Sequence, residues 1–448
     1  MNIKRFSTIV AFLVALAAQA QVSFTGNNKE VFDEIPAKST GLNHIYVLYD
    51  TNGVGMTYTA STGETVTWAE FGAQGAAYEQ EITNIQRSGR ETTLSQVTPG
   101  KGYHIKEGLE RETYVWVINY ADYYLRLINV IPDEKSDCGS TTINIQGKGD
   151  AIPYYTINGV HKTLSRELKL NFNTLRWDDD EVQWLKVDTT ETFEYVKPTT
   201  VIVAPLCNTQ FTLSGDRFLN FWNEGVELVS DTYNTTSIDV QTTATQEKKE
   251  GHDNEKGNDQ EGVLGGSAPV TITFKAYCTE AVSHLEWQEA SDADFNNIIL
   301  RLDDEEVTQT FNEAGTFYWR FYATNADASC EAVSETYTVN IGESELVCPN
   351  VFSPGSTEGA NDIWKVSYKS ITEFHCSIFN IWGVEMISFN DPSQGWDGKY
   401  KGKLVSPGTY YYVIQAVGAD GQKYKLSGDI NIIRYKRHNS TGGSTVTE

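Results

Sequence analysis

The stretch GTYYYVIQAVGADGQKYKLSGDINII, residues 408–433, decides the fold of its region most clearly. Residues 410–417 alternate side chains with a period of two, which predicts a β-strand whose two faces are both at least partly covered. Asp420-Gly421 interrupts the run and residues 424–433 resume it, as in a hairpin with a type I′ turn. The end of the chain is therefore expected to be antiparallel β-structure.

The composition extends this expectation to the whole chain of 448 residues, which is long enough for three or four domains. Aromatic residues make up 12% of it and there are three methionines. Thr, Val, Ile and Tyr recur in short runs cut by Gly, Asn and Asp, which is typical of all-β proteins. The predicted fold class is all-β, with tandem Ig-like β-sandwich domains and a C-terminal β-sandwich.

The C-terminal region also carries an ordered set of motifs: VCPNVFSP at 347–354, GANDIW at 359–364, IFNIWG at 378–383, GWDGKYKGK at 395–403 and DINIIR at 429–434. This order resembles the gliding-motility-associated C-terminal domain, the type B sorting domain of proteins exported by the type IX secretion system. The resemblance covers about a fifth of the chain. The residues that carry it are Pro349, Asn350, Phe352, Pro354, Asn361, Asp362, Trp382, Gly383, Trp396, Asp397, Gly398, Gly408, Tyr410, Gly428 and Arg434.

The sequence departs from the family pattern at two places. The family has an Asn-Gly-Asp-Gly loop after Phe-Ser-Pro, whereas Pro354 here is followed by GSTEG, which argues against a cation site in that loop. Family members tend to stop at the terminal arginine, but this chain continues with a polar tail at 435–448, which we expect to be disordered.

The N-terminus predicts the same export route. Lys4 and Arg5 precede an apolar run at 9–18, and Ala18-Gln19-Ala20 supplies the small residues of a signal peptidase site, so residues 1–20 are expected to be a signal peptide. No later segment is apolar enough to be a transmembrane helix. The protein is therefore expected to pass through the periplasm to the outer-membrane surface or to be secreted.

Between these ends the pattern of strands and turns predicts four domains, with boundaries at 21–134 (N-terminal β domain), 135–243 (β-sandwich), 268–343 (Ig/PKD-like) and 346–434 (sorting domain). Residues 244–267 are almost free of hydrophobic side chains and rich in charge and Gly, which predicts a linker. In the third domain, Val270, Ile272, Phe274 and Ala276 alternate with polar residues. The domain resembles PKD and Ig-like modules.

Six cysteines, at 138, 207, 278, 330, 348 and 376, imply disulfides in an exported protein. Six cysteines allow fifteen connectivities. The hypothesis adopted is consecutive pairing, Cys138 with Cys207, Cys278 with Cys330 and Cys348 with Cys376, which places one bridge in each of three domains. Metal binding by these cysteines is disfavoured because there is no C-x-x-C motif and no nearby His. In the third domain Trp287 lies between the two cysteines, the order found in immunoglobulin domains.

The charge argues against some partners. The formal net charge is −25, while residues 346–434 contain equal numbers of acidic and basic residues, so the acidity belongs to the first three quarters of the chain. An acidic body argues against nucleic-acid binding, which needs a basic surface. An acidic surface is compatible with binding of cations or of basic partners.

No catalytic motif is found. The seven histidines form no H-E-x-x-H, and there is no G-x-S-x-G, Walker loop or dinucleotide fingerprint. Two acidic clusters, which include Asp178, Asp180, Asp303 and Asp304, are weak candidates for calcium; solvated loops are the default interpretation. No other cofactor is expected, and the protein is predicted not to be an enzyme.

Aromatic residues offer one further candidate site. Trp177 and Trp184 flank the first acidic cluster, and Phe218, Phe221 and Trp222 lie near Asn220 and Asn223, a combination that would suit sugar binding. The competing interpretation is that these side chains fill the cores of thin sandwiches.

These observations favour a non-enzymatic cell-surface protein that acts in surface assembly or as an adhesin. The resemblance implies the type IX secretion machinery as a partner, together with an outer-membrane β-barrel of the PorP/SprF type. The alternative is a secreted carbohydrate-binding or carbohydrate-active protein with its site in the N-terminal β domains.

Overall fold

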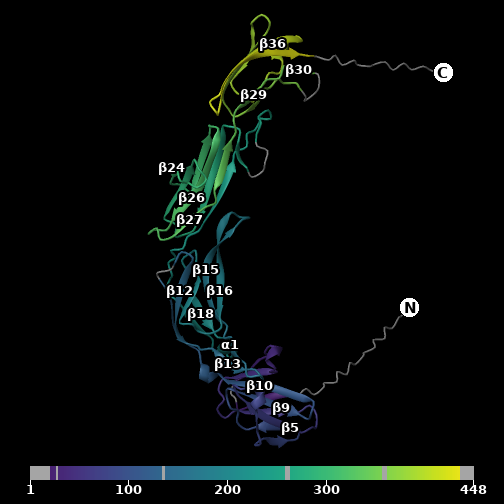
Figure 1. Ribbon diagram of the computed structural model, residues 1–448, viewed down its shortest axis with the longest axis vertical. Coiled ribbons are helices and arrows are strands. Elements are labelled where there is room, and N and C mark those ends of the chain that lie inside the picture. The colour runs from purple at the N-terminus through teal and green to yellow at the C-terminus, as the bar shows by residue number, and fades with distance from the viewer. Residues whose placement is uncertain (1–20, 27–28, 134–136, 258–262, 356–360, 434–448) are drawn as a thin grey trace, which may run out of the picture. The chain divides into compact units, whose positions relative to one another are not determined.

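The computed structural model describes residues 21–26, 29–133, 137–257, 263–355 and 361–433 (Figure 1). The predicted signal peptide, Arg434 and the tail at 435–448 lie outside this range. The described chain is β-structure with one short α-helix, so the all-β prediction is confirmed. Its contacts divide it into two compact units, Met1–Thr174 with Lys186–Thr235 and Leu175–Leu185 with Thr236–Glu448, which we describe separately. No helix in the described residues is long and apolar enough to cross a membrane.

The first unit begins with two sheets. Their orders are β1-β4-β8-β7 and β2-β3-β10-β9-β5-β6, and β10 lies parallel to β3 and antiparallel to β9. Their elements are β1 (Gln21–Thr25), β2 (Phe32–Glu34), η1 (Lys38–Thr40), β3 (His44–Leu48), β4 (Gly55–Thr59), β5 (Val66–Phe71), η2 (Ala76–Tyr78), β6 (Gln80–Glu81), β7 (Gln86–Ser88), β8 (Glu91–Leu94), β9 (Lys101–Glu107), β10 (Arg111–Asn119) and η3 (Tyr120–Tyr123).

The six-stranded sheet is covered on both faces. Alternate residues of β10 separate the two layers: Val115 and Val117 belong to the core shared with Met56 and Trp68. Trp116 and Ile118 belong to a second core that continues into the following domain. The first two domains of this unit therefore share a hydrophobic core.

Glu107 ties the end of β9 to the loop between β4 and β5. It is buried, and its carboxylate accepts hydrogen bonds from the Tyr58 hydroxyl at 3.0 Å, from the Ser61 N–H at 3.2 Å and from both the N–H and the hydroxyl of Thr62. Burial opposes ionisation, but the hydrogen bonds from Thr62 and Ser61 outweigh it and lower the pKa of Glu107 to about 2.

We expect Glu107→Gln to lower the local unfolding free energy at neutral pH by up to about 3 kcal/mol. Because the folded pKa lies below the ordinary value of 4.5, the ionised carboxylate stabilises the fold fully above that value and loses this effect as the pH falls towards 2. Hydrogen exchange of β4 and β9 peptides at several pH values measures the difference between the variant and the wild type. A difference that does not shrink in acid would contradict this account.

The second domain of this unit contains the strands β11 (Arg126–Pro132), β12 (Ser140–Lys148), β13 (Ile152–Tyr155), β14 (His161–Leu164), β15 (Leu168–Asp178), β16 (Gln183–Phe193), β17 (Thr199–Val203), β18 (Thr212–Gly215) and β19 (Val226–Val229), with α1 (Arg217–Phe221). They form the sheets β11-β12-β17 and β16-β15-β18-β19 and the hairpin β13-β14. In the four-stranded sheet β15 lies between β16 and β18. Asp216 caps α1 by accepting a hydrogen bond from the Leu219 N–H at 2.9 Å.

A fully buried ion pair lies at the base of this domain. The Arg166 guanidinium donates to the Asp216 carboxylate, to the Asp150 carbonyl at 2.8 Å and to the Tyr123 carbonyl. Asp216 also accepts from the Tyr120 hydroxyl at 3.0 Å. The pair therefore joins η3 of the first domain to α1 of the second through a connected polar network.

The second unit contains the predicted Ig-like domain. Its strands are β20 (Val240–Gln246), β21 (Leu264–Gly266), β22 (Val270–Cys278), β23 (His284–Ala290), β24 (Ile298–Leu302), β25 (Glu306–Phe311), β26 (Gly315–Thr324), β27 (Glu331–Val333) and β28 (Tyr337–Ile341). They form the sheets β20-β22-β25 and β21-β28-β26-β23-β24, with β27 beside β26.

The core of this domain has the residues that the alternation predicts. Ile272 and Phe274 of β22 are fully buried together with Trp287 and Trp319. Phe274 stacks on Trp319 with a ring centroid distance of 4.6 Å. The sandwich therefore forms around aromatic residues contributed by both sheets.

The prediction of a linker at 244–267 is wrong at the two ends of that stretch. Residues 244–246 continue β20, and Leu264–Gly266 form β21, which pairs parallel with β28. An edge strand pairs with only one neighbour and needs only one apolar face. A short edge strand can therefore have low hydrophobicity, and composition alone does not distinguish it from a linker.

Candidate functional site

The C-terminal region, residues 345–432, is a small domain of nine strands within the described residues. These are β29 (Glu345–Val347), β30 (Val351–Phe352), β31 (Ser367–Lys369), β32 (Ile371–Phe379), β33 (Glu385–Phe389), β34 (Lys399–Tyr400), β35 (Lys403–Leu404), β36 (Gly408–Gly418) and β37 (Lys423–Ile432). The main sheet has the order β30-β37-β36-β32-β33, in which β30 lies parallel to β37. The pairs β29-β31 and β34-β35 complete it.

The predicted hairpin is present as β36 and β37, but its turn is not of type I′. That turn needs positive φ at both central residues, whereas φ is positive at Gly421 and not at Asp420. The Gly418 N–H donates to the Gln422 carbonyl at 2.8 Å, so the connection is longer than two residues. Only one face of β36 is covered: Ile414 is fully buried, while Tyr411 and Val413 are exposed.

Two tryptophans organise the core. Trp364 and Trp396 are fully buried and form an isolated antiparallel bridge, with N···O distances of 2.8 and 2.9 Å. The Trp364 indole donates to the Pro349 carbonyl at 2.7 Å. Trp396 packs against Phe352 and Tyr410 at centroid distances of 5.6 and 5.0 Å. Motifs far apart in the sequence therefore meet around these two indoles.

Several other motif residues serve close packing. Gly398 has a φ of +70°, and a Cβ there would lie 2.8 Å from Cγ of Pro354. A Cβ at Gly428 would lie 2.6 Å from the Tyr412 hydroxyl. The remaining residues hold turns and strand ends: the Asn350 carbonyl accepts from the Asn431 N–H, Asp362 from the Gly355 N–H, and Asp397 from the Lys399 N–H.

Trp382 differs from the buried aromatic motif residues Phe352, Trp396 and Tyr410 because it is 82% exposed. It lies in the turn between β32 and β33, next to Gly383, which has a φ of +75°. The Asn380 side chain accepts hydrogen bonds from the N–H groups of Trp382 and Val384, both at 2.9 Å, and fixes the turn. A large aromatic side chain held outwards by a rigid turn is suited to contact another protein.

A segment upstream of the matched motifs also contacts this domain. The Asn254 side-chain amide donates to the carbonyls of Val366 at 2.6 Å and Pro392 at 2.8 Å, and the main-chain carbonyl of Asn254 accepts from the Tyr368 N–H at 3.2 Å. The Lys256 N–H donates to the Tyr368 carbonyl, so the segment lies along β31 as an additional parallel strand partner. We call residues 252–256 the clasp.

We expect Asn254→Ala to destabilise the clasp by about 1–2 kcal/mol, because two hydrogen bonds to main-chain carbonyls are lost. Faster hydrogen exchange at the Tyr368 amide measures the effect. Lys256→Ala is the control, since it removes only an exposed ion pair with Glu345 and should change exchange little. Equal effects of the two substitutions would contradict the assigned role of Asn254.

The cysteines do not follow the consecutive pairing. Cys138 and Cys330 are disulfide-bonded, while Cys207, Cys278, Cys348 and Cys376 carry thiols. Cys330 lies in a turn after β26, where its N–H donates to the Asn325 side chain, and not within a central strand as in an immunoglobulin domain. Burial raises the pKa of the Cys278 and Cys376 thiols to about 12, so both are protonated at neutral pH.

The acidic clusters serve turns and loops. Asp178 accepts hydrogen bonds from the N–H groups of Asp180 and Glu181 at 3.0 and 2.9 Å and so closes the β15–β16 turn. Asp303 and Asp304 are exposed in the connection between β24 and β25. In the part of the chain that the structure describes, no three His, Cys, Asp or Glu side chains come together as a metal site.

The aromatic candidates for sugar binding are used in packing. Phe218 is fully buried and Trp222 is nearly so, in the core that joins the first two domains. Trp177 and Trp184 are half-buried against Tyr277, whose carbonyl accepts from the Trp184 indole at 3.0 Å. Neither group forms an exposed stacking platform.

Two family models match parts of the chain. Residues 346–432 match the CHU_C type IX secretion signal domain, which confirms the resemblance seen in the motifs. Residues 130–230 match a fibronectin type III domain. The first match implies that the type IX secretion machinery takes part in export of this chain to the cell surface or in its secretion. Domains of both kinds are typically non-catalytic.

Comparison with solved structures adds no functional information. The chain is similar to the three N-terminal domains of the bacteriophage RB49 highly immunogenic outer capsid protein, at 9% identity over 69% of this chain and 100% of that chain, with a TM-score of 0.22. It is also similar to Sidekick-1 immunoglobulin domains 1–5, at 11% identity over 88% of this chain and 78% of that chain, with a TM-score of 0.25. No curated protein matches the chain.

Proposed function

We propose that this chain is a non-enzymatic cell-surface protein that uses residues 346–434 for export by the type IX secretion system and acts in surface assembly or adhesion. The observation that carries the proposal is the match of residues 346–432 to a type IX secretion signal domain. It is supported by the tandem β-sandwich architecture in front of that domain, which suits display of binding surfaces.

The proposed membrane partner is an outer-membrane β-barrel of the PorP/SprF type. The turn at Trp382 supports a protein contact on the sorting domain, since this tryptophan is 82% exposed. Residues 346–434 carry no net charge, although the whole chain has a net charge of −25. We therefore expect this contact to depend on shape complementarity and apolar surface more than on charge attraction.

A non-enzymatic role is supported by the way in which the described candidate residues are used. The Asp178 cluster closes a turn, and the aromatic residues near α1 lie in a core. Glu107, whose pKa is lowered, is surrounded by the hydrogen bonds of a structural loop.

Deletion of residues 346–448 tests the proposal. We expect the shortened protein to remain in the periplasm, protected from protease added to whole cells, and the intact protein to be cleaved at the surface. Affinity purification of the intact protein should recover a β-barrel that the shortened protein does not. Surface delivery of the shortened protein would refute the assigned route.

A further inference from the structure

The third domain has an open sheet edge that the proposed function does not use. β20 is the first strand of the sheet β20-β22-β25, and within the described residues no strand pairs with its outer edge. It is seven residues long. An unpaired edge of this kind is a template for an added strand.

The register shows which main-chain groups face outwards. The Thr279 N–H donates to the Asp239 carbonyl at 3.2 Å, and the Glu247 N–H donates to the Thr271 carbonyl at 3.0 Å. Asp239 and Glu247 flank β20, and both form main-chain hydrogen bonds to the β22 side. Because hydrogen-bonded positions alternate in an antiparallel pair, the odd-numbered residues of β20 bond to β22. The N–H and C=O groups of Thr242 and Ala244 therefore point away from β22, towards the open edge.

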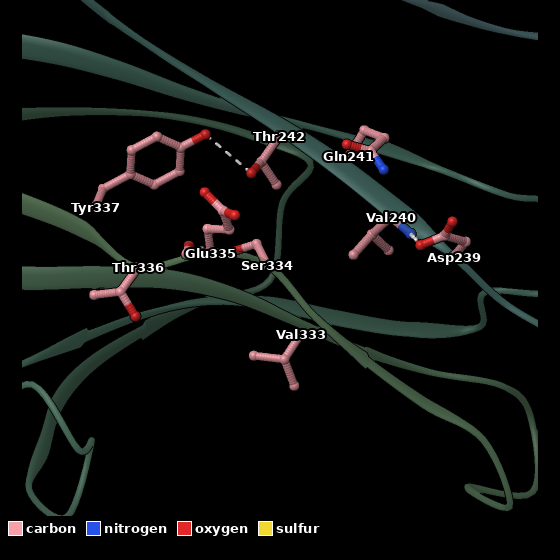
Figure 2. Close-up of a pocket in the computed structure, with 9 residues that line it drawn as sticks. All are labelled: Asp239, Val240, Gln241, Thr242, Val333, Ser334, Glu335, Thr336 and Tyr337. Carbon is pink, nitrogen blue, oxygen red and sulfur yellow. Dashed lines mark hydrogen bonds between the residues drawn. The ribbon is translucent and has the colours of Figure 1, made fainter. Parts of the chain in front are cut away.

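A groove runs along this edge, between the two sheets. One cavity of about 440 Å³ is lined by residues 239–242 on one side and 333–337 on the other (Figure 2). A second cavity of about 320 Å³ is lined by residues 244–246, Val263, Leu264 and Tyr337. Tyr337 borders both cavities, and its hydroxyl donates to Thr242 Oγ1 at 3.0 Å. The two cavities thus follow each other along β20.

The two parts of the groove differ in chemistry. Asp239 and the exposed Glu335 line the first, and Figure 2 shows the Glu335 carboxylate between Tyr337 and Ser334. Among the described residues, neither carboxylate forms an ion pair with Lys, Arg or His. Ala244, Leu264 and the Tyr337 ring give the second part an apolar lining.

We propose that this groove binds an extended peptide segment of a basic partner protein, which adds to β20 as a new edge strand. Its main chain would bond to Thr242 and Ala244. A Lys or Arg side chain would face Glu335, and an apolar side chain two residues away would face Ala244 and Leu264, because alternate residues of a strand share a face. A second copy of this chain is a poor occupant, since each copy has a net charge of −25.

The full-length protein and a labelled peptide of sequence Thr-Lys-Thr-Val-Thr-Lys-Thr-Val-Thr test the proposal by fluorescence anisotropy. We expect saturable binding with a Kd below about 1 mM. Bound peptide should slow hydrogen exchange at the amides of Thr242 and Ala244. Absence of binding, or binding without this protection, would overturn the proposal.

Two substitutions separate the main-chain contact from the charge contact. Ala244→Pro removes an outward N–H without breaking the pairing with β22, and should weaken peptide binding at least about tenfold. Thr308→Pro makes the same change on the opposite edge strand β25, and should leave binding unchanged. Glu335→Gln should weaken binding of the Lys peptide several-fold but not that of a peptide with Gln in place of Lys. Equal loss with both proline variants, or no loss with Ala244→Pro, would refute strand addition at β20.

Discussion

Replacement of Arg166 by alanine is expected to destabilise the first unit by about 3–5 kcal/mol, because it leaves the buried Asp216 carboxylate without its counter-ion. Both side chains are fully buried, and the guanidinium also satisfies the carbonyls of Asp150 and Tyr123. Increased hydrogen exchange in β15, which begins two residues after Arg166, and in β18, which ends one residue before Asp216, measures the loss.

Arg217→Ala is the control for this prediction. Arg217 lies one residue beyond Asp216, but it is partly exposed and pairs with Glu34 and Glu167 near the surface. Its removal should cost no more than about 1 kcal/mol. If the two alanine variants exchange at the same rate, the buried network is not what holds the first two domains together.

Trp396→Ala is expected to have the second large effect, because it removes a fully buried indole that contacts Phe352 and Tyr410 and bridges to Trp364. A loss of about 3–5 kcal/mol is a large fraction of the stability expected of a domain of this size. The variant should therefore accumulate in the periplasm with a protease-sensitive C-terminus. Cell fractionation followed by limited proteolysis measures both properties.

Trp382→Ala provides the matched comparison, since it removes an exposed tryptophan from the same domain. It should change stability by less than about 0.5 kcal/mol. If Trp382 contacts the export machinery, this variant should be folded yet poorly delivered. Normal export of the Trp396→Ala variant would show that the folded sorting domain is not required.

The hydrophobic alternation of the strands was sufficient to predict the Ig-like domain. Ile272 and Phe274 of β22 point into the core as their spacing predicts, because a strand has only two faces and one of them is buried. The motifs of the C-terminal region were equally informative. Phe352 and Tyr410 lie in one core with Trp364 and Trp396, so most of the motif aromatics share one packed core, whereas Trp382 stays exposed.

Other features depend on contacts between distant residues and could not be predicted. Arg166 carries no local signal for burial, because its partners Asp150, Tyr123 and Asp216 come from three separate segments. The clasp at 252–256 is polar and resembles a linker in composition, yet Asn254 finds main-chain partners on the sorting domain. The prediction of consecutive disulfide pairing was wrong. The number and spacing of cysteines in a sequence do not determine which of them are bonded.

A fusion protein tests whether residues 346–434 direct export. A signal peptide and a fluorescent protein are joined to residues 346–448, and access of externally added protease to the fluorescent protein is measured in cells with and without a working type IX secretion system. We expect the fluorescent protein to be exposed at the surface only in cells where the system works, and Trp396→Ala to abolish this exposure. Retention of the fusion in the periplasm with a folded sorting domain would contradict this expectation.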